Sequence, residues 1–243
     1  KFEELLYFQL TILRQIALKK EKTRKPIKTK KTLQNNLIER LPFSLTTEQE
    51  KVLEEINADL AKPVLMTRLL QGDVGSGKTL VAFLSALPCI ESGFQVAFMA
   101  PTELLAQQHA SKAAFFLEPL GLRVAILTGS LSNEQRRPLL DALQNGEIDI
   151  LMGTHALFSE AVRFRSLGLV IVDEQQRFGV LQRLSLLEKS NTADLLLMTA
   201  TPIPRTMALT VFGDLDISTI EALPPGRKPV QTHLAQEKKK KKV

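Results

Sequence analysis

Residues 72–79 read Gly72-Asp73-Val74-Gly75-Ser76-Gly77-Lys78-Thr79, which matches the phosphate-binding pattern G-x-x-x-x-G-K-[ST] without a gap. An apolar run over 65–70 precedes this loop, and a helical apolar period over 80–90 follows it. Such glycines let backbone N–H groups surround a phosphate chain at the beginning of a helix. A glycine-rich turn that matches by chance is the alternative, and the flanking elements argue against it. The residues expected to bind the phosphates of ATP are Gly72, Gly75, Ser76, Gly77, Lys78 and Thr79.

Two of these side chains have distinct expected roles. Lys78 should reach the β- and γ-phosphates, and the Thr79 hydroxyl should be a ligand of Mg²⁺. A second candidate for the metal follows the apolar run 169–172, which ends in the acids Asp173 and Glu174. Ligands of an open α/β sheet bind at the carboxyl ends of its strands. Asp173 is therefore suited to hold Mg²⁺, and Glu174 to activate the water that attacks the γ-phosphate. Acids that only cap the next turn are the alternative, which the upstream phosphate loop disfavours.

Short apolar runs alternate with helical periods along most of the chain, which is typical of parallel β-α units with both sheet faces covered. The sequence thus predicts an α/β domain over residues 41–230, with a mainly parallel sheet and helices on both faces. The predicted strands are 65–70, 95–100, 124–128, 148–152, 169–172 and 195–199, and the predicted helices are 48–60, 78–91, 103–117 and 133–144.

The two ends of the chain differ from this core in charge. Residues 1–40 carry a net +7 and residues 231–243 a net +4, whereas residues 41–230 carry −5. The overall charge of +6 therefore does not indicate a basic DNA-binding groove on the core. Residues 2–18 are predicted to form an amphipathic helix, residues 19–31 a basic linker, and 231–243 a lysine-rich tail. The apolar face of that helix would consist of Leu6, Leu10, Leu13 and Ala17.

Composition excludes several classes of protein. No apolar run approaches the ~18 residues of a membrane span, and the N-terminus lacks the pattern of a signal peptide. The single cysteine, Cys89, has no partner for an internal disulfide and lies in an apolar helical stretch, so we expect a core side chain. These features favour a cytoplasmic protein.

The order of the motifs along the chain resembles that of a known protein family. Over residues 41–230 the chain resembles the first RecA-like motor domain of superfamily 2 helicases. After the phosphate loop, the matching segments are Ala100-Pro101-Thr102-Glu103-Leu104-Leu105-Ala106, Thr128-Gly129-Ser130, Gly153-Thr154-His155-Ala156-Leu157, Asp173-Glu174-Gln175-Gln176-Arg177-Phe178-Gly179-Val180 and Thr199-Ala200-Thr201-Pro202-Ile203-Pro204-Arg205-Thr206.

Within that superfamily the chain looks like the RecG branch more than the transcription-repair coupling translocases. The segments that carry this likeness are Leu41-Pro42-Phe43 with Leu45, Thr46 and Gln49, then Gly213-Asp214-Leu215-Asp216-Ile217-Ser218, and Leu223-Pro224-Pro225-Gly226-Arg227-Lys228-Pro229. RecG proteins typically have His as the fourth residue of the D-E-x-H box, where this chain has Gln176. An amide both donates and accepts hydrogen bonds but does not titrate.

The resemblance implies roles for several further residues. Gln176 would link the nucleotide site to Thr199 and Thr201, while no role is assigned to Arg205. Gln49 would contact adenine, although Thr46 and Gln49 also fit a capping box, and both readings stay open. His155 has no second ligand at a suitable spacing and is not expected to bind a metal. The candidate contacts with DNA phosphates are Thr102, Thr128, Gly129 and Thr154.

For the whole protein, the resemblance implies an ATP-driven DNA helicase that translocates on duplex DNA and remodels stalled forks and Holliday junctions in recombination and repair. A coupling translocase, or a nucleotide-binding module without unwinding activity, is the alternative. The family completes its ATP site with a second RecA-like domain and also has a wedge domain, and neither is found in this sequence. We therefore expect a monomer with ATP and Mg²⁺ as cofactors, nearly inactive without those domains.

Overall fold

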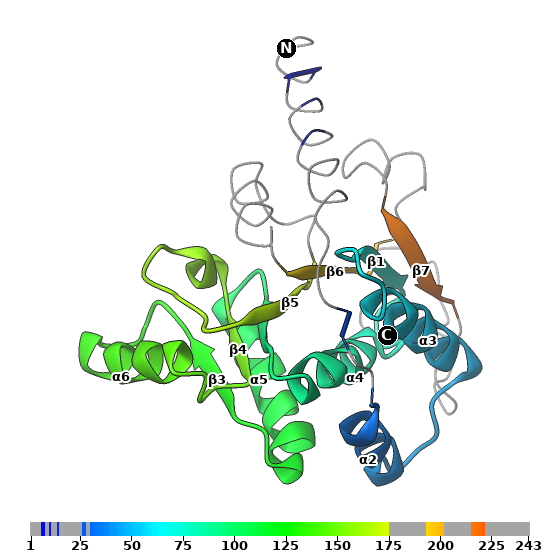
Figure 1. Ribbon diagram of the computed structural model, residues 1–243, viewed down its shortest axis with the longest axis horizontal. Helices are drawn as coiled ribbons and strands as arrows, with labels where there is room; N and C mark the ends of the chain where they lie inside the picture. The colour runs from blue at the N-terminus through cyan, green and yellow to red at the C-terminus, as the bar shows by residue number, and fades with distance from the viewer. Residues whose placement is uncertain are drawn as a thin grey trace, which may run out of the picture.

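The computed structural model describes residues 30–174, 193–201 and 215–221, together with 6, 7, 10, 14, 26 and 27. Within this part the chain forms a seven-stranded sheet of order β3-β4-β2-β5-β6-β1-β7 (Figure 1). All of its neighbouring strands are parallel. The strands are β1 (Thr67–Gly72), β2 (Gln95–Met99), β3 (Val124–Leu127), β4 (Ile150–Gly153), β5 (Leu167–Val172), β6 (Asp194–Thr199) and β7 (Asp216–Ile220).

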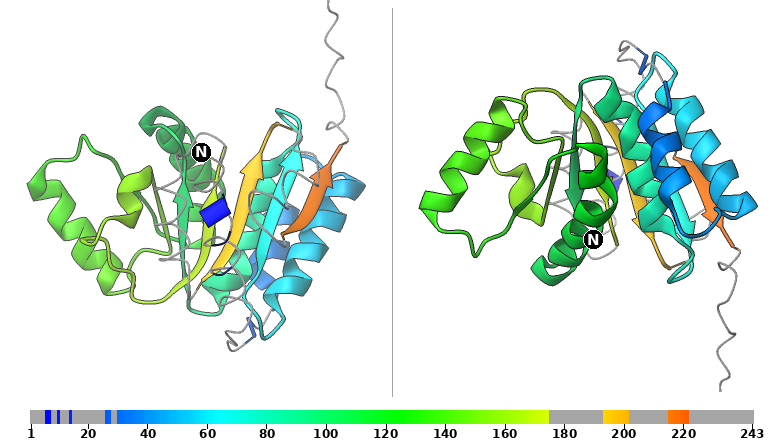
Figure 2. Two further views of the ribbon diagram at one scale, coloured as in Figure 1. Left: turned by 90° about the horizontal axis from the view of Figure 1, so that it is seen from above. Right: turned by 90° about the horizontal axis from the view of Figure 1, so that it is seen from below.

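Two of the described helices precede β1 in the sequence, and the other three lie between strands. The described helices are α2 (Thr32–Arg40), α3 (Thr47–Leu60), α4 (Lys78–Glu91), α5 (Glu103–Leu117) and α6 (Asn133–Gln144), with short 3-10 turns at Glu118–Leu120 and His155–Phe158. Seen from below, α2, α3, α4 and α5 lie in front of the strands and cover one face of the sheet (Figure 2, right). The α/β class and parallel sheet predicted from the sequence are thereby confirmed.

Two apolar clusters lie on the two faces of the sheet, because successive strand residues point to opposite sides. On β5, Ile171 belongs to the cluster under α3, α4 and α5, and Val170 belongs to the cluster that includes Leu143 of α6 and Leu157. Both faces are covered, and the strands β2, β4, β5 and β6 are accordingly mostly apolar. Cys89 is buried among them on α4, as predicted.

Helix ends follow local capping chemistry. Side-chain oxygens of Thr46, Thr102 and Ser132 accept hydrogen bonds from the third residue of α3, α5 and α6. Helices α4, α5 and α6 have the bounds expected from the sequence, and α3 begins one residue earlier. All six predicted strands form, with ends shifted by no more than about two residues, the usual disagreement at element ends.

Apart from the 3-10 turns, one described helix and one described strand were not predicted. No element was predicted over residues 32–40, where α2 docks on the core through Gln34 and Leu37. The Gln34 amide donates to the Leu84 carbonyl of α4 at 2.9 Å and accepts from Asn57 of α3 at 3.0 Å. Residues that pack on the α/β domain thus begin before residue 41, where the sequence predicts the start of that domain. The second missed element is the edge strand β7, which pairs with β1.

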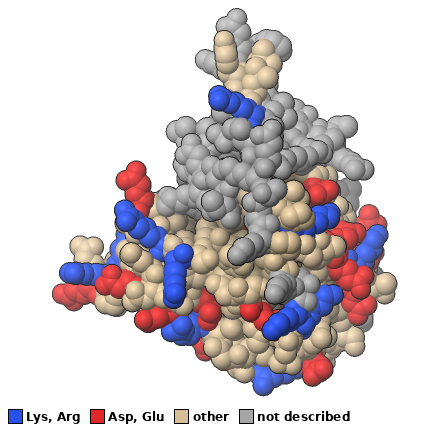
Figure 3. Space-filling view, viewed as in Figure 1, with Lys and Arg blue, Asp and Glu red and all other residues tan. Residues whose placement is uncertain are grey.

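The predicted N-terminal helix falls mostly outside the described residues. Its described members, Leu6, Tyr7, Leu10 and Arg14, are helical and exposed. The lysine-rich tail also lies outside them. On the face drawn in Figure 3, Lys and Arg side chains are interspersed with Asp and Glu, over α6 at one end and α3 at the other. Within the described residues, no helix combines the length and the apolar character that crossing a membrane requires.

Candidate active site

The phosphate loop connects β1 to α4, and its geometry depends on glycine. Gly75 and Gly77 have φ angles of 80° and 92°, in the left-handed region that other residues rarely adopt. A Cβ added to Gly77 would lie 2.3 Å from the Gln49 side-chain nitrogen, so the close approach of α3 also requires glycine. The Ser76 hydroxyl is buried beneath the loop and has no hydrogen-bond partner among the described residues.

Lys78 is the first residue of α4, and its ammonium group points back into the loop. Its Nζ donates to the carbonyl oxygens of Gly72 at 2.7 Å and Asp73 at 2.8 Å. Burial lowers the pKa of Lys78, while the nearby carboxylates of Asp173, Glu174 and Asp73 act in the opposite direction. A buried cation held only by carbonyl dipoles and more distant acids is a strong site for an added anion, such as a phosphate.

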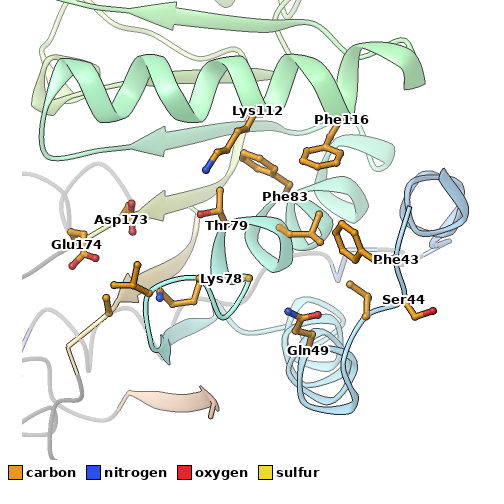
Figure 4. A pocket seen from close by; sticks show the side chains of 16 residues that line it. Phe43, Ser44, Gln49, Lys78, Thr79, Phe83, Lys112, Phe116, Asp173 and Glu174 are labelled. Carbon is orange, nitrogen blue, oxygen red and sulfur yellow. The ribbon is translucent and has the colours of Figure 1, made fainter. Parts of the chain in front are cut away.

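The acid pair lies at the carboxyl end of β5, next to the phosphate loop, as the sequence analysis expected. Asp173, Glu174, Lys78 and Thr79 line one cavity of about 920 Å³ (Figure 4). The Asp173 backbone N–H donates to the Met99 carbonyl at 2.8 Å, which fixes the carboxyl end of β5 against β2. Glu174 has a φ of 48°, and non-glycine residues in this region cluster at functional sites.

The oxygens in this cavity fit Mg²⁺. Magnesium in nucleotide sites is usually held by one or two carboxylates together with phosphate oxygens and waters, rather than by a cage of protein ligands. Thr79 and Asp173 supply a hydroxyl and a carboxylate on the same cavity wall. Within the described residues no group of three or more His, Cys, Asp or Glu could hold a metal without such a substrate. The donor set therefore suits a metal that arrives with a nucleotide.

Gln49 of α3 performs the capping role and also contacts the phosphate loop. Its side-chain oxygen accepts from the Thr46 backbone N–H at 3.0 Å, which completes the predicted capping box. Its side-chain nitrogen donates to the Ser76 carbonyl at 2.7 Å. Both ends of the amide are thus engaged, and the contact between Gln49 and adenine stays a prediction.

The other side of the cavity carries aromatic rings. The aromatic residues there are Phe43, Phe83 and Phe116, of which Phe43 precedes α3 and is 51% exposed (Figure 4). An aromatic surface beside a phosphate-binding loop suits a nucleotide, because an adenine base has a flat face that stacks on such rings. Phe43 carries part of the family likeness in the sequence, but no role was predicted for it there.

Asp173 has a further partner that the sequence analysis missed. His109 of α5 lies with its Nε2 2.8 Å from the Asp173 Oδ2, and both side chains are largely buried. The helical period supplied a signal, since the buried residues of α5 are Ala106, His109, Ala113 and Leu117. A polar residue on an otherwise apolar helix face requires a buried hydrogen-bond partner.

The DNA-contact candidates lie together at the carboxyl edge of the sheet. Thr102, Thr128 and Thr154 follow β2, β3 and β4, which are neighbours in the sheet. The Gly129 N–H donates to the Glu103 carboxylate of α5 at 2.7 Å, which joins two of these loops. Thr102 and Gly129 are exposed, whereas Thr128 and Thr154 are buried. An external phosphate can thus reach the exposed chain at Thr102 and Gly129 more easily than the buried hydroxyls of Thr128 and Thr154.

The coupling candidates are described only in part. At the end of β6, the hydroxyls of Thr199 and Thr201 lie 2.9 Å apart, and the Thr201 N–H donates to the Thr199 hydroxyl at 3.1 Å. Strand β6 lies between β5 and β1, so this pair is next to the acids and the phosphate loop. Gln176 and Arg205 lie outside the described residues. The link between Gln176 and the two threonines therefore stays a prediction.

Known proteins match both the motifs and the fold. The DEAD/DEAH box helicase family matches residues 46–210. The ATP-dependent DNA helicase RecG of Treponema pallidum is 56% identical over 218 residues, 87% of this chain and 32% of that protein. RecG of Aquifex aeolicus is 51% identical over 245 residues, 100% of this chain and 31% of that protein. This chain therefore spans about a third of the length of these relatives.

A solved structure of RecG bound to a three-way DNA junction superposes with a TM-score of 0.83 and 43% identity, over 98% of this chain and 32% of that one. The helicase domain of Pyrococcus furiosus Hef, at 21% identity and a TM-score of 0.54 over 71% of this chain and 37% of that one, shares the fold. With the phosphate loop and acid pair in one cavity, these matches show that the chain belongs to the DEAD/DEAH box helicase family, as a RecG-type member.

Proposed function

We propose that this chain is the ATP-binding motor domain of a RecG-like DNA helicase. The whole protein would couple ATP hydrolysis to translocation on duplex DNA and to remodelling of stalled forks and Holliday junctions. The observation that supports this most directly is the cavity at the carboxyl edge of the sheet, where Lys78, Thr79, Asp173 and Glu174 converge. The curated relatives named RecG are the second support.

In the proposed reaction, water attacks the γ-phosphorus and the bond between that phosphorus and the β–γ bridging oxygen breaks, giving ADP and inorganic phosphate. Lys78 binds the β- and γ-phosphate oxygens and offsets their charge. Glu174 orients the water and accepts its proton. Thr79 and Asp173 would hold Mg²⁺, which neutralises charge on the phosphates when it is bound with ATP.

We further propose that a second RecA-like domain completes this site, as the family resemblance implies. The described residues of the cavity supply one side of the γ-phosphate, and the family places arginine residues on the other side. In GTPases an arginine supplied in this way is worth about 10³–10⁵ in rate. This chain by itself should therefore bind ATP·Mg²⁺ weakly and hydrolyse it near background.

For DNA, we propose that the loops after β2, β3 and β4 contact the phosphate backbone without reading bases. The exposed Thr102 caps the start of α5, and the exposed Gly129 is joined to the same helix end by its bond to Glu103. Gln176 would then connect the nucleotide to Thr199 and Thr201. Through this link, the binding and hydrolysis of ATP would change the contacts with DNA at the carboxyl edge of the sheet. We place the protein in the cytoplasm, as a monomer that binds branched DNA.

The test compares how strongly DNA substrates of different structure stimulate ATP hydrolysis by the full-length protein. Steady-state ATP turnover should rise more with forked or four-way DNA than with linear duplex of the same length, and the same protein should convert a model fork into its reversed form. The Lys78→Ala variant serves as the control without ATP binding. Turnover insensitive to DNA would favour a nucleotide-binding module, and stimulation that requires RNA polymerase would favour a coupling translocase.

Phe43 offers a separate check on where the base lies. Phe43→Ala should weaken ATP binding about tenfold, because base–aromatic stacking is worth about 1–3 kcal/mol per base. Phe43→Tyr keeps the ring and should bind ATP normally, as measured by fluorescence titration with labelled ATP. The Val64→Ala variant, at an exposed apolar residue between α3 and β1, is the matched control. Unchanged affinity in Phe43→Ala would place the base elsewhere in the cavity.

A further inference from the structure

His109 occupies a position where a purely apolar side chain would be expected. It lies on the inner face of α5 between Ala106 and Ala113, with 6% of its surface exposed. Its ring packs against Phe98 of β2, with ring centroids 4.9 Å apart. A Leu or Met would fill this space without introducing a polar group into the core. The presence of a histidine at this position must therefore be explained by its hydrogen-bond partners.

One nitrogen of the ring has a partner and the other does not. The Asp173 carboxylate can only accept, so the Nε2–H of His109 donates to its Oδ2 at 2.8 Å. The Nδ1 is buried and has no hydrogen-bond partner in the part of the chain that the structure describes. A buried acceptor without a partner destabilises the folded state. Packing and folding stability alone therefore give a poor account of a histidine here.

The bond acts on the orientation of the carboxylate. The terminal torsion of an aspartate is broad, so a free carboxylate turns readily about its last bond. With Oδ2 held by His109, and the backbone of Asp173 held by Met99, the remaining oxygen Oδ1 is left for the cavity that Asp173 lines. Thr79 lines the same cavity, so the Asp173 carboxylate is oriented on the cavity that also contains the second proposed metal ligand before a nucleotide arrives.

We propose that His109 is a positioning residue for Mg²⁺ with nucleotide: it fixes the Asp173 carboxylate from behind, so that one oxygen is presented to the metal. This deepens the proposed function and rests on it. Partners that orient metal ligands in this way typically contribute 10–100-fold to metal affinity. The effect should therefore appear in the metal dependence of nucleotide binding, separately from any turnover.

The experiment measures binding of a fluorescent ADP, mant-ADP, to the intact protein during a titration with MgCl₂, and once with EDTA. His109→Leu keeps the volume and removes the donor. We expect its affinity for mant-ADP in EDTA to equal that of the unmodified protein, while the Mg²⁺ concentration for half-maximal binding rises about 10–100-fold. His109→Gln restores an amide donor at a similar reach and should bring the Mg²⁺ midpoint back toward normal.

The matched control is Leu117→Ala, on the same buried face of α5 two turns beyond His109. It should lower the thermal midpoint of unfolding and leave the Mg²⁺ midpoint unchanged. An unchanged Mg²⁺ midpoint in His109→Leu would overturn the positioning role, as would equal shifts in the Leu, Gln and Leu117→Ala variants. If the unmodified protein binds no mant-ADP at all, the proposed function falls, and the role of His109 falls with it.

Discussion

The Glu174→Gln variant of the full-length protein should bind ATP·Mg²⁺ normally and hydrolyse it about 10²–10⁴-fold more slowly, the usual contribution of a general base. The amide has the same size as the carboxylate and still orients water through its oxygen, but it is a poor acceptor for the proton that the water loses. Glu174 lies directly after Asp173 at the end of β5 and lines the cavity together with Lys78. The other carboxylate in that lining, Asp173, is the one proposed to hold Mg²⁺.

Single-turnover hydrolysis of radiolabelled ATP, with binding measured in parallel, separates the two effects. Glu134→Gln at the start of α6 is the control, since this acid lies in the first turn of a helix away from the cavity. Its turnover should equal that of the unmodified protein. Full turnover by Glu174→Gln would assign the base to a different residue and leave Glu174 as a structural part of the turn after β5.

Lys78→Ala should lower the affinity for ATP at least about 100-fold, because two charge-assisted hydrogen bonds to phosphate are lost at about 1.5–3 kcal/mol each. The affinity for adenosine, which has no phosphate, should not change. Isothermal titration with ATP, ADP and adenosine checks both statements. Lys112→Ala removes an exposed cation from the same cavity lining and serves as the control. Equal ATP affinity in Lys78→Ala and the unmodified protein would contradict the assignment.

The same variant should remain folded. Burial lowers the pKa of Lys78, so the folded protein binds its proton less readily than the unfolded chain. A group shifted downward in this way destabilises the folded state at neutral pH, and that penalty declines as the pH rises toward 10.5. The Lys78→Ala variant loses this penalty together with the hydrogen bonds to the Gly72 and Asp73 carbonyls. Because these two effects oppose each other, the thermal midpoint of Lys78→Ala without nucleotide should stay close to that of the unmodified protein at pH 7.

Local chemistry explains why much of the fold could be predicted. The bounds of α5 and α6 follow from their caps, Thr102 and Ser132, and from apolar periods that are visible in the sequence. The cavity could be anticipated because carboxyl ends of parallel strands share one edge, which brings Asp173 to the phosphate loop although the two are far apart in the chain. These inferences need only periodicity and one rule of topology.

The elements that escaped prediction depend on distant contacts. Strand β7 is only five residues long and has two apolar residues, Ile217 and Ile220, and it is a strand because β1 lies beside it. Helix α2 is largely polar, and its buried Gln34 is satisfied by α3 and α4. His109 and Asp173 are 64 residues apart, and no local pattern joins them. Each case required knowledge of which elements pack together.

The place of β1 in the sheet has a consequence for how the chain acquires its activity. Its two neighbours, β6 and β7, both come much later in the sequence: Met66 bonds Asp194 across 128 residues, and Arg68 bonds Ser218 across 150. Contacts at such separations form slowly, because long loops must close first. During synthesis, β1 therefore has no neighbouring strand to pair with on either edge until nearly the whole domain has left the ribosome. Its apolar residues are a liability for aggregation in that interval, and competence to bind ATP marks the completion of folding.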